Sequence, residues 1–136
     1  MKDTLTTGIT HAMTYQVPAN RTVPNLLPEA TDFTTMPEVL ATGYMVGIIE
    51  WACMQAIREH LEDTEISLGT HVNFSHQAPT VPGSTVTIDV EVTQIERRSV
   101  TFRIEAHDEC NTISVGTHQR GVVDRATFES RLPKES

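Results

Sequence analysis

The amino-acid sequence predicts an α+β domain in which an antiparallel sheet wraps around one long apolar helix. Two observations predict this class. A helix-length segment, residues 40–61, is apolar on nearly all of its faces, and the segments that follow it alternate apolar and polar residues. A helix that is apolar all round is normally buried, and period-two alternation is typical of strands with one buried face. Because helix and sheet must each cover an apolar face, they form two layers around one core.

The first part of the chain supplies a short strand, a long link and the helix. Residues 11–17 (HAMTYQV) predict the first strand. The link that follows, residues 20–37, carries three of the seven prolines and has no regular period. Connections of this length without regular structure are uncommon in compact domains. The helix, residues 40–61, contains no proline and turns polar at its far end, so we expect that end to emerge into solvent.

The second half of the chain predicts four further strands, residues 67–77, 85–95, 100–106 and 112–123. Polar turns, ERRS and DECN, join the last three strands as an antiparallel meander. The C-terminal tail, residues 125–136, begins with a short helix that Asp124 caps and that Phe128 and Leu132 dock. Antiparallel strands joined by short turns around one apolar helix describe a hotdog fold. The whole chain, residues 1–136, suffices for a single such domain.

Composition argues against several classes of function. The net charge of −8 argues against a nucleic-acid partner, which would require a basic surface. No apolar segment is long and charge-free enough to span a membrane, and the N-terminus lacks an apolar signal core, so we expect a cytoplasmic protein without a membrane partner. Cys53 and Cys110 stand in unlike surroundings and indicate no disulfide framework. No CxxC or HxxxH spacing occurs, and His71 and His76 fall on opposite faces of a strand, so we expect no metal site.

One carboxylate, Glu50, stands in the middle of the apolar helix, between Ile49 and Trp51. Burying an unpaired carboxylate costs on the order of several kcal/mol, so such a residue needs a partner or a function. It is either a structural acid, hydrogen-bonded to the backbone or to a residue at a dimer seam, or a desolvated carboxylate that acts as a base or a nucleophile. The second interpretation has a chemical reason: removal of water raises the pKa of a carboxylate and so makes it a stronger base.

Three segments carry a resemblance to a known family. PEVLATGYMVGIIEWACMQAI, SLGTHVNFSHQAPTVPG and GTHQRGVV are similar, in order and spacing, to the fluoroacetyl-CoA thioesterase family of hotdog proteins. The resemblance runs from roughly Val23 to Phe128, most of the chain. It implies an acyl-CoA thioesterase that acts as a homodimer and needs no cofactor, because coenzyme A is part of the substrate. The threonine, glutamate and histidine of the family's active site correspond to Thr42, Glu50 and His76.

The chemistry of thioester hydrolysis suits these three residues. Glu50 can direct a water at the thioester carbonyl, or attack it to form a mixed anhydride that water then opens; the sequence leaves both routes open. His76 alone is a strand-end histidine, but beside a carboxylate and a hydroxyl it can carry protons near neutral pH. Thr42 has two interpretations. It is the N-cap of the helix, or its hydroxyl bonds the carbonyl, assists the base or acts as a nucleophile.

Thr42 and Glu50 cannot touch within one regular helix, because eight residues separate them by about 12 Å along the axis and roughly 80° around it. They meet through substrate, water or His76, through an irregular start of the helix, or across a dimer interface. We favour the dimer, since exposed strand edges and so apolar a helix both promote pairing.

Further residues are expected to contact the substrate. Gly69 lies inside a strand, where a glycine marks either a bulge or the close approach of a ligand, and the resemblance favours an N–H that stabilises the thioester oxyanion. Arg120 is either an exposed arginine or a substrate or active-site contact. The link, residues 20–37, is either a lid over the acyl pocket or a flap over the core. Its apolar residues with an expected substrate role are Val23, Leu26, Phe33 and Met36.

The acyl group stays open at this point. The family's fluoroacetyl-CoA thioesterase has phenylalanine where Met36 stands, which bears on fluoroacetyl specificity more than on thioesterase chemistry. A small or substituted acyl group fits, and fluoroacetyl is one such group. Two alternatives remain: a thioesterase for a different acyl-CoA with the same three residues, and a non-catalytic acyl-CoA-binding dimer, which predicts that those three positions are broken. Arg97 and Arg98, in a turn, are candidates for contacts with CoA.

Overall fold

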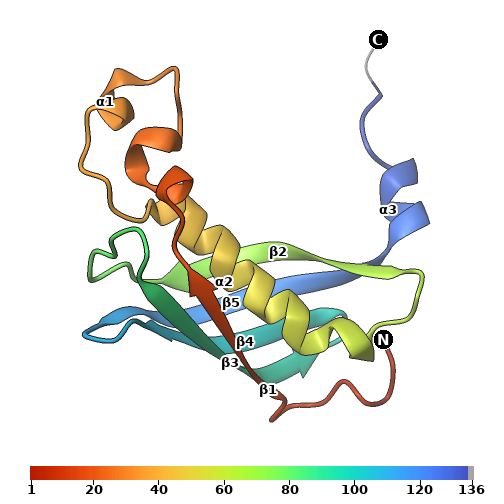
Figure 1. Ribbon diagram of the computed structural model, residues 1–136. Helices are drawn as coiled ribbons and strands as arrows, with labels where there is room; N and C mark the ends of the chain where they lie inside the picture. Colours follow the sequence, from red (N-terminus) through yellow and green to blue (C-terminus); the bar gives the residue numbers. More distant parts are fainter. Residues whose placement is uncertain (135–136) are drawn as a thin grey trace.

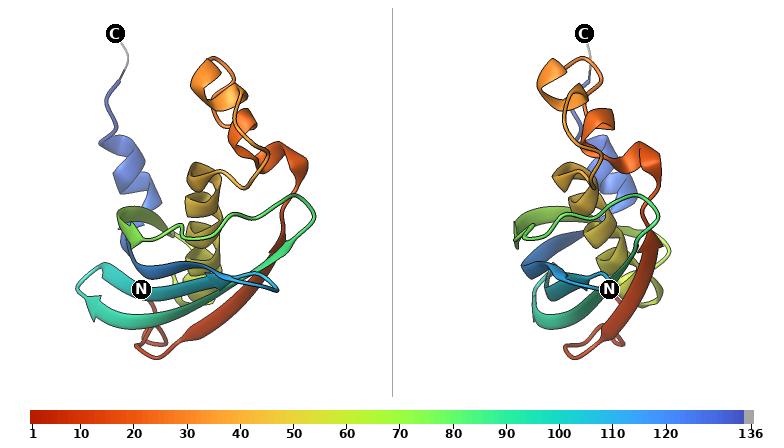
Figure 2. Two further views of the ribbon diagram at one scale, coloured as in Figure 1. Left: turned by 90° about the vertical axis from the view of Figure 1, so that its left-hand side faces the viewer. Right: turned by 60° about the vertical axis from the view of Figure 1, so that its left-hand side comes forward.

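Five strands form one antiparallel sheet that curves around a single long helix (Figure 1). The computed structural model describes residues 1–134, and residues 135 and 136 of the predicted tail lie outside the described part. The strands are β1 (Thr10–Gln16), β2 (Glu65–Phe74), β3 (Thr85–Glu96), β4 (Ser99–His107) and β5 (Thr112–Asp124). Their order across the sheet is β1-β3-β4-β5-β2, so β1 and β2 are the two edges. The helix α2 (Thr42–Ile57) lies on the concave face, and Figure 2 shows the sheet curving around it.

The predicted helix and all five predicted strands are present, and their ends differ from the predictions by only a few residues. The shorter segments are η1 (Ala19–Arg21), η2 (Val23–Asn25), α1 (Thr31–Thr34), η3 (Arg58–His60) and α3 (Arg125–Ser130). Three of these, η1, η2 and α1, lie in the link that was expected to be irregular, so that expectation is wrong. Proline fits the first turn of a helix because its missing N–H needs no partner there, and Pro24 occupies such a position in η2.

The core lies between α2 and the inner face of the sheet. Alternation along two central strands turns one set of side chains toward the helix: Val86, Ile88, Val90 and Val92 of β3, and Val100, Phe102, Ile104 and Ala106 of β4. Burying a large apolar side chain of this kind contributes roughly 1.5–3 kcal/mol. The helix is not covered all round, however. Trp51 is 46% exposed and Met54 is 40% exposed, so the expectation of a helix buried on every side is wrong for the single chain.

The C-terminal tail follows the prediction in part. The Asp124 carboxylate accepts a hydrogen bond from the Thr127 N–H at 2.9 Å and caps α3, as expected. Leu132, which was predicted to dock the tail, is exposed, because the tail projects away from the sheet (Figure 1). Among residues 1–134, no helix has the length and apolar character needed to cross a membrane. The two cysteines are unpaired, with Cys53 buried in the core and Cys110 exposed in a turn.

Candidate active site

A buried cation on the last strand contacts the carboxylate of the central helix. His118 and Arg120 are two residues apart on β5 and both lie on the face toward the core; His118 has no exposed surface and Arg120 is 3% exposed. The Arg120 Nη1–H donates to Glu50 Oε1 at 3.0 Å. The interpretation of Arg120 as an exposed arginine is therefore wrong. Arg120 and Glu50 form an ion pair between β5 and α2.

Three further hydrogen bonds hold the Arg120 guanidinium. Its Nε–H donates to Ser67 Oγ at 2.8 Å and its Nη2–H donates to the Ser67 carbonyl at 2.9 Å. Nη1 also donates to His118 Nε2, at 3.1 Å. A buried guanidinium is costly unless its donors have acceptors, and here the acceptors come from β2, β5 and α2. The guanidinium is therefore held in one orientation, with one Nη1–H directed at Glu50.

Glu50 is only partly buried within one chain. Its side chain is 34% exposed, so the carboxylate is paired on one side and open to solvent on the other. The single chain therefore does not remove water from this carboxylate as expected. Trp51 and Met54 on the same helix are exposed as well, so this part of α2 is uncovered. How far water is removed from Glu50 depends on what covers this part of α2.

Gly69 leaves the space that the Glu50 carboxylate occupies. A β-carbon at position 69 would overlap Glu50 Oε1 and would lie 3.4 Å from the His118 ring. The register between β2 and β5 shifts between Gly69 and His71, so a bulge lies at this glycine as well. Bulges are common beside active sites, where they redirect the chain. The predicted bulge is present, and within one chain the group that approaches the Gly69 backbone is the Glu50 side chain.

A second pair of side chains lies at the start of α2. Thr42 Oγ1 and His76 Nδ1 are 2.8 Å apart. His76 follows the end of β2 in a loop, and within residues 1–134 its Nε2 atom is buried without a hydrogen-bond partner. Burial lowers the pKa of His76, so the ring is neutral at pH 7. The N-cap of α2 is Ala41 and it makes no side-chain cap bond. The N-cap interpretation of Thr42 is therefore wrong, and its hydroxyl contacts His76 instead.

The Thr42–His76 pair borders a cavity of about 290 Å³ that Val23, Leu40 and Pro79 also line. Leu26 packs on the start of α2, with a methyl group 3.1 Å from where a β-carbon on Gly43 would stand. Of the four link residues with an expected substrate role, Val23 thus lies beside the pair and Leu26 beside the helix.

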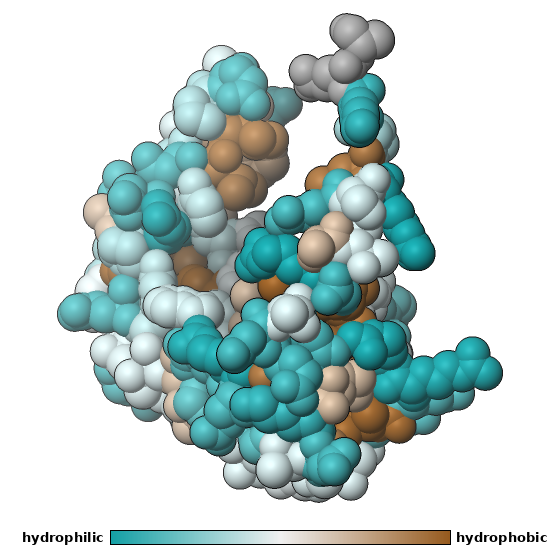
Figure 3. All heavy atoms as spheres, turned by 90° about the vertical axis from the view of Figure 1, so that its right-hand side faces the viewer, coloured by the Kyte–Doolittle hydropathy of each residue, from teal (hydrophilic) through white to brown (hydrophobic). Residues whose placement is uncertain are grey.

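The other two link residues, Phe33 and Met36, lie on the projecting part of the link that includes α1 (Figure 1). Phe33 is half-buried, whereas Met36 is 49% exposed. Figure 3 shows apolar side chains gathered on the side of this projection that faces α3, across an open hollow. The structure therefore does not bring Phe33 and Met36 together with Thr42, His76 or Glu50 in one chain.

Thr42 and Glu50 stay apart within one chain. The helix α2 is continuous from Thr42 to Ile57, so the helical rise separates Thr42 from Glu50 by about 12 Å. The structure therefore excludes an irregular start of the helix as the way in which these two residues meet. Substrate, water, His76 and a second copy of the chain remain.

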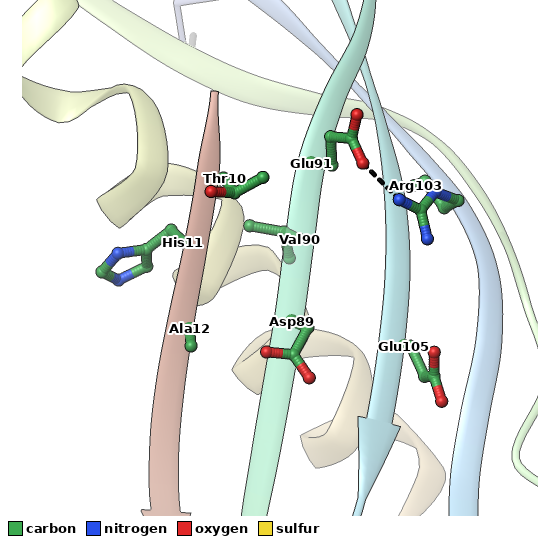
Figure 4. Close-up of a pocket in the computed structure, with 8 residues that line it drawn as sticks. All are labelled: Thr10, His11, Ala12, Asp89, Val90, Glu91, Arg103 and Glu105. Carbon is green, nitrogen blue, oxygen red and sulfur yellow. Dashed lines mark hydrogen bonds and ion pairs between the residues drawn. The ribbon is translucent and has the colours of Figure 1, made fainter. Parts of the chain in front are cut away.

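A groove of about 440 Å³ lies elsewhere, on the outer face of β1, β3 and β4, and holds none of the predicted site residues. Figure 4 shows the carboxylates of Asp89, Glu91 and Glu105 in it, with Glu91 paired to Arg103. The His11 ring points away from Glu91 and Glu105 and is hydrogen-bonded to Gln55 of α2. This groove lies across a polar, solvated sheet face, so we assign the chemistry to the inner side of the sheet despite its smaller cavity.

Sequence reasoning missed Ser67 and His118, although both lie in segments that were singled out. The available signal was the sequence THQR, in which a histidine and an arginine two residues apart must share one face of a strand. Arg98, a candidate for contact with CoA, donates to Glu65 Oε2 at 2.5 Å and to the Val122 carbonyl at 2.8 Å. These bonds tie its side chain to the fold, although 54% of that side chain stays exposed.

Comparisons with known proteins identify the family and the fold of this chain. A family model described as fluoroacetyl-CoA-specific thioesterase matches residues 22–126. The fluoroacetyl-CoA thioesterase of Streptantibioticus cattleyicolor is 40% identical over 136 residues, which cover 100% of this chain and 98% of that protein. A threonine-to-serine variant of the fluoroacetyl-CoA enzyme, solved in complex with acetyl-CoA, aligns with a TM-score of 0.91 at 40% identity and covers 93% of this chain and 96% of its own.

The fold has further relatives at lower identity. A hotdog-like protein from Thermanaerovibrio acidaminovorans aligns with a TM-score of 0.78 at 23% identity, over 92% of this chain and 88% of its own. The predictions of the hotdog fold, of the family and of a thioester hydrolase are confirmed. The chain belongs to the fluoroacetyl-CoA-specific thioesterase family.

Proposed function

We propose that this protein hydrolyses short acyl-CoA thioesters, with Glu50, Thr42 and His76 as its catalytic residues. The observation that carries the proposal is the bond from Arg120 to Glu50, which fixes one carboxylate oxygen on the exposed side of an apolar helix. The family membership supports the reaction, and the complex of a relative with acetyl-CoA supports the class of substrate. Fluoroacetyl-CoA is one substrate within this class.

Glu50 attacks the thioester indirectly or directly. In the first route Glu50 takes a proton from a water while the water oxygen bonds to the carbonyl carbon; the C–S bond then breaks, and the leaving CoA thiolate takes up the proton from Glu50, which regenerates the base. In the second route a Glu50 oxygen bonds to the carbonyl carbon, the thiolate leaves, and water opens the mixed anhydride. A thiol with a pKa of roughly 8.5 leaves readily, so attack is the demanding step in either route.

The other residues orient the substrate and move protons. We assign the Gly69 N–H to the thioester oxygen, where negative charge develops during attack. The Thr42 hydroxyl and the His76 ring form one unit, since their polar atoms are 2.8 Å apart. The neutral His76 ring can accept or donate a proton, and its buried Nε2, which has no partner within residues 1–134, is the atom that a substrate or water would satisfy.

We further propose that the active unit is a homodimer. Trp51 and Met54 are exposed beside Glu50, and Val72 is 46% exposed on the edge strand β2. An open strand edge and an exposed apolar helix face are both covered when a second copy docks. Such a partner would remove water from Glu50, which one chain leaves one-third exposed. It would also allow Glu50 of one protomer to meet Thr42 and His76 of its partner.

The link, residues 20–37, is the lid over the acyl group in this proposal. Its base is held by the Val23 N–H to Val39 carbonyl bond at 2.9 Å and by the Tyr44 hydroxyl, which donates to the Asn25 carbonyl at 3.1 Å. The projecting part offers Phe33 and Met36. A flexible methionine fills irregular space, so this lid suits a range of small acyl groups.

Hydrolysis of an acyl-CoA panel by the wild-type protein tests the function. The panel holds acetyl-, fluoroacetyl-, propionyl- and longer acyl-CoA thioesters, and thiol release is followed with a chromogenic disulfide. We expect the highest kcat/KM among the short acyl groups. No thiol release from any member, together with acyl-CoA binding in calorimetry, would establish the non-catalytic binding dimer instead. A maximum at long chains would establish a thioesterase for a different acyl-CoA.

Mixed dimers test whether two protomers build each site. Glu50→Gln and His76→Ala chains are coexpressed with different tags, and the doubly tagged species is isolated. If Glu50 meets the partner's His76, one of the two sites in each mixed dimer is intact, and the activity is about half that of wild type while each parent is inactive. A mixed dimer as inactive as its parents would assign all three residues to one protomer. A doubly tagged wild-type dimer is the control.

A further inference from the structure

We propose that His118 is a positioning residue for the reaction, which holds the Arg120 guanidinium against Glu50. The inference rests on the proposed function of Glu50 and extends it to a residue on the far side of Arg120. His118 has no exposed surface, so it cannot touch an acyl-CoA from within its own chain.

The hydrogen bonds of His118 assign its protons. His118 Nδ1 lies 2.8 Å from the His71 carbonyl oxygen, and a carbonyl can only accept, so Nδ1 carries the proton. His118 Nε2 lies 3.1 Å from Arg120 Nη1, and a guanidinium can only donate, so Nε2 offers its lone pair. The ring is therefore the neutral Nδ1–H tautomer, and it links the His71 carbonyl to the cation that contacts Glu50.

The neighbours of His118 support this state. Phe102 stacks on the ring at 6.4 Å between centroids, and Phe74 meets it edge-on at 6.3 Å. The titratable and charged groups that face it are Arg120 on β5, Glu50 on α2 and His71 on β2. Burial in this apolar setting, followed by the effect of the Arg120 charge, lowers the pKa of His118, although the His71 bond and Glu50 act in the opposite direction. A protonated ring would lose the acceptor and repel Arg120.

The β-bulge on β2 fixes the position of the His71 carbonyl to which His118 donates. The ladder between β2 and β5 pairs Gly69 with Arg120 and His71 with Gln119, so Thr70 is the extra residue. The bulge thus lies beside both Glu50 and His118: Gly69 makes room for the Glu50 carboxylate, and the His71 carbonyl accepts a hydrogen bond from His118. The path from bulge to histidine, arginine and carboxylate consists only of short polar contacts, and it runs from the core to the partly exposed Glu50.

Two substitutions separate the two bonds of His118. In His118→Gln the amide reaches the position of Nε2, and its oxygen can accept from Arg120. In His118→Asn the shorter amide reaches only the His71 carbonyl, so Arg120 loses its acceptor. We expect His118→Asn to lower kcat about 10- to 100-fold with little change in KM, and His118→Gln to stay within about threefold of wild type, because a small displacement of a reacting group costs rate rather than binding. Both are assayed well below their Tm.

A matched control and a spectroscopic readout complete the test. His107→Gln replaces a partly exposed histidine next to the outer sheet face and should leave kcat unchanged. Nitrogen-15 NMR of labelled histidine should show, for the signal missing in His118→Gln, a protonated Nδ1 and an unprotonated Nε2 at pH 7. An Nε2–H tautomer, or a His118→Asn variant with wild-type kcat, would overturn the role of His118. Full activity of Glu50→Gln would overturn the proposed role of Glu50 instead, whatever the tautomer.

Discussion

Replacing Glu50 with glutamine is expected to lower kcat for acyl-CoA hydrolysis about 10²- to 10⁴-fold, the range in which a positioned general base contributes. Glutamine keeps an oxygen that can accept from Arg120, so the bond that now measures 3.0 Å is retained while the base and nucleophile are lost. Glu50 is partly exposed, which further limits the effect of this change on folding. Initial rates on the most reactive member of the acyl-CoA panel measure the loss.

The control for Glu50→Gln is Glu105→Gln, which removes an exposed carboxylate from the outer groove (Figure 4). It should retain wild-type kcat and KM. Circular dichroism and thermal unfolding check that both variants fold as wild type does. A Glu50→Gln protein with undiminished turnover would show that the carboxylate is a structural acid, which is the other interpretation of this residue.

Replacing Arg120 with methionine is expected to reduce both stability and activity, because several buried groups lose their donor together. Methionine fills much of the volume of the arginine stem, but the Ser67 hydroxyl and carbonyl and His118 Nε2 are left without the bonds that Arg120 donates. Unsatisfied buried polar groups and a broken ion pair cost about 2–4 kcal/mol in sum, discounted here because Glu50 can turn toward solvent. Denaturant unfolding measures this loss.

The activity of Arg120→Met should fall even where the protein is folded. Without the guanidinium the Glu50 carboxylate loses its fixed direction, and a misplaced base costs about 10²-fold in rate. Arg103→Met is the matched control, since Arg103 is 63% exposed and pairs with Glu91 on the outer face; such exposed pairs contribute roughly 0–1 kcal/mol. Equal stability losses in Arg120→Met and Arg103→Met would contradict the buried network.

The fold follows from local patterns that can be read along the chain. Alternation of Val86, Ile88 and Val90 with polar residues identifies β3 and the face that it buries. The apolar segment without proline identifies α2, and Asp124 identifies the start of α3. The link was the exception. Its 3₁₀ turns and the one-turn helix α1 are too short to produce a period, so only the structure reveals them.

Some features of the candidate site also follow from the sequence, whereas others depend on the tertiary structure. The sequence by itself determined that Glu50 is an acid out of place in an apolar helix, and that Thr42 and Glu50 cannot meet within that helix, because both statements depend only on residue type and helical geometry. The resemblance then suggested His76 as the third residue, and the structure brings it to Thr42.

Only the tertiary structure decided what Glu50 contacts. Strand order places β5 beside β2, and Gly69, which has no β-carbon, makes room for the carboxylate. Ser67 and His118, from these two strands, hold Arg120 against one helix residue. No local period encodes that convergence, because it depends on the register between segments about fifty residues apart in the chain. The exposure of Trp51 and of Glu50 was equally beyond the sequence pattern, since an apolar helix has the same periodicity whether a sheet or a second protein molecule covers it.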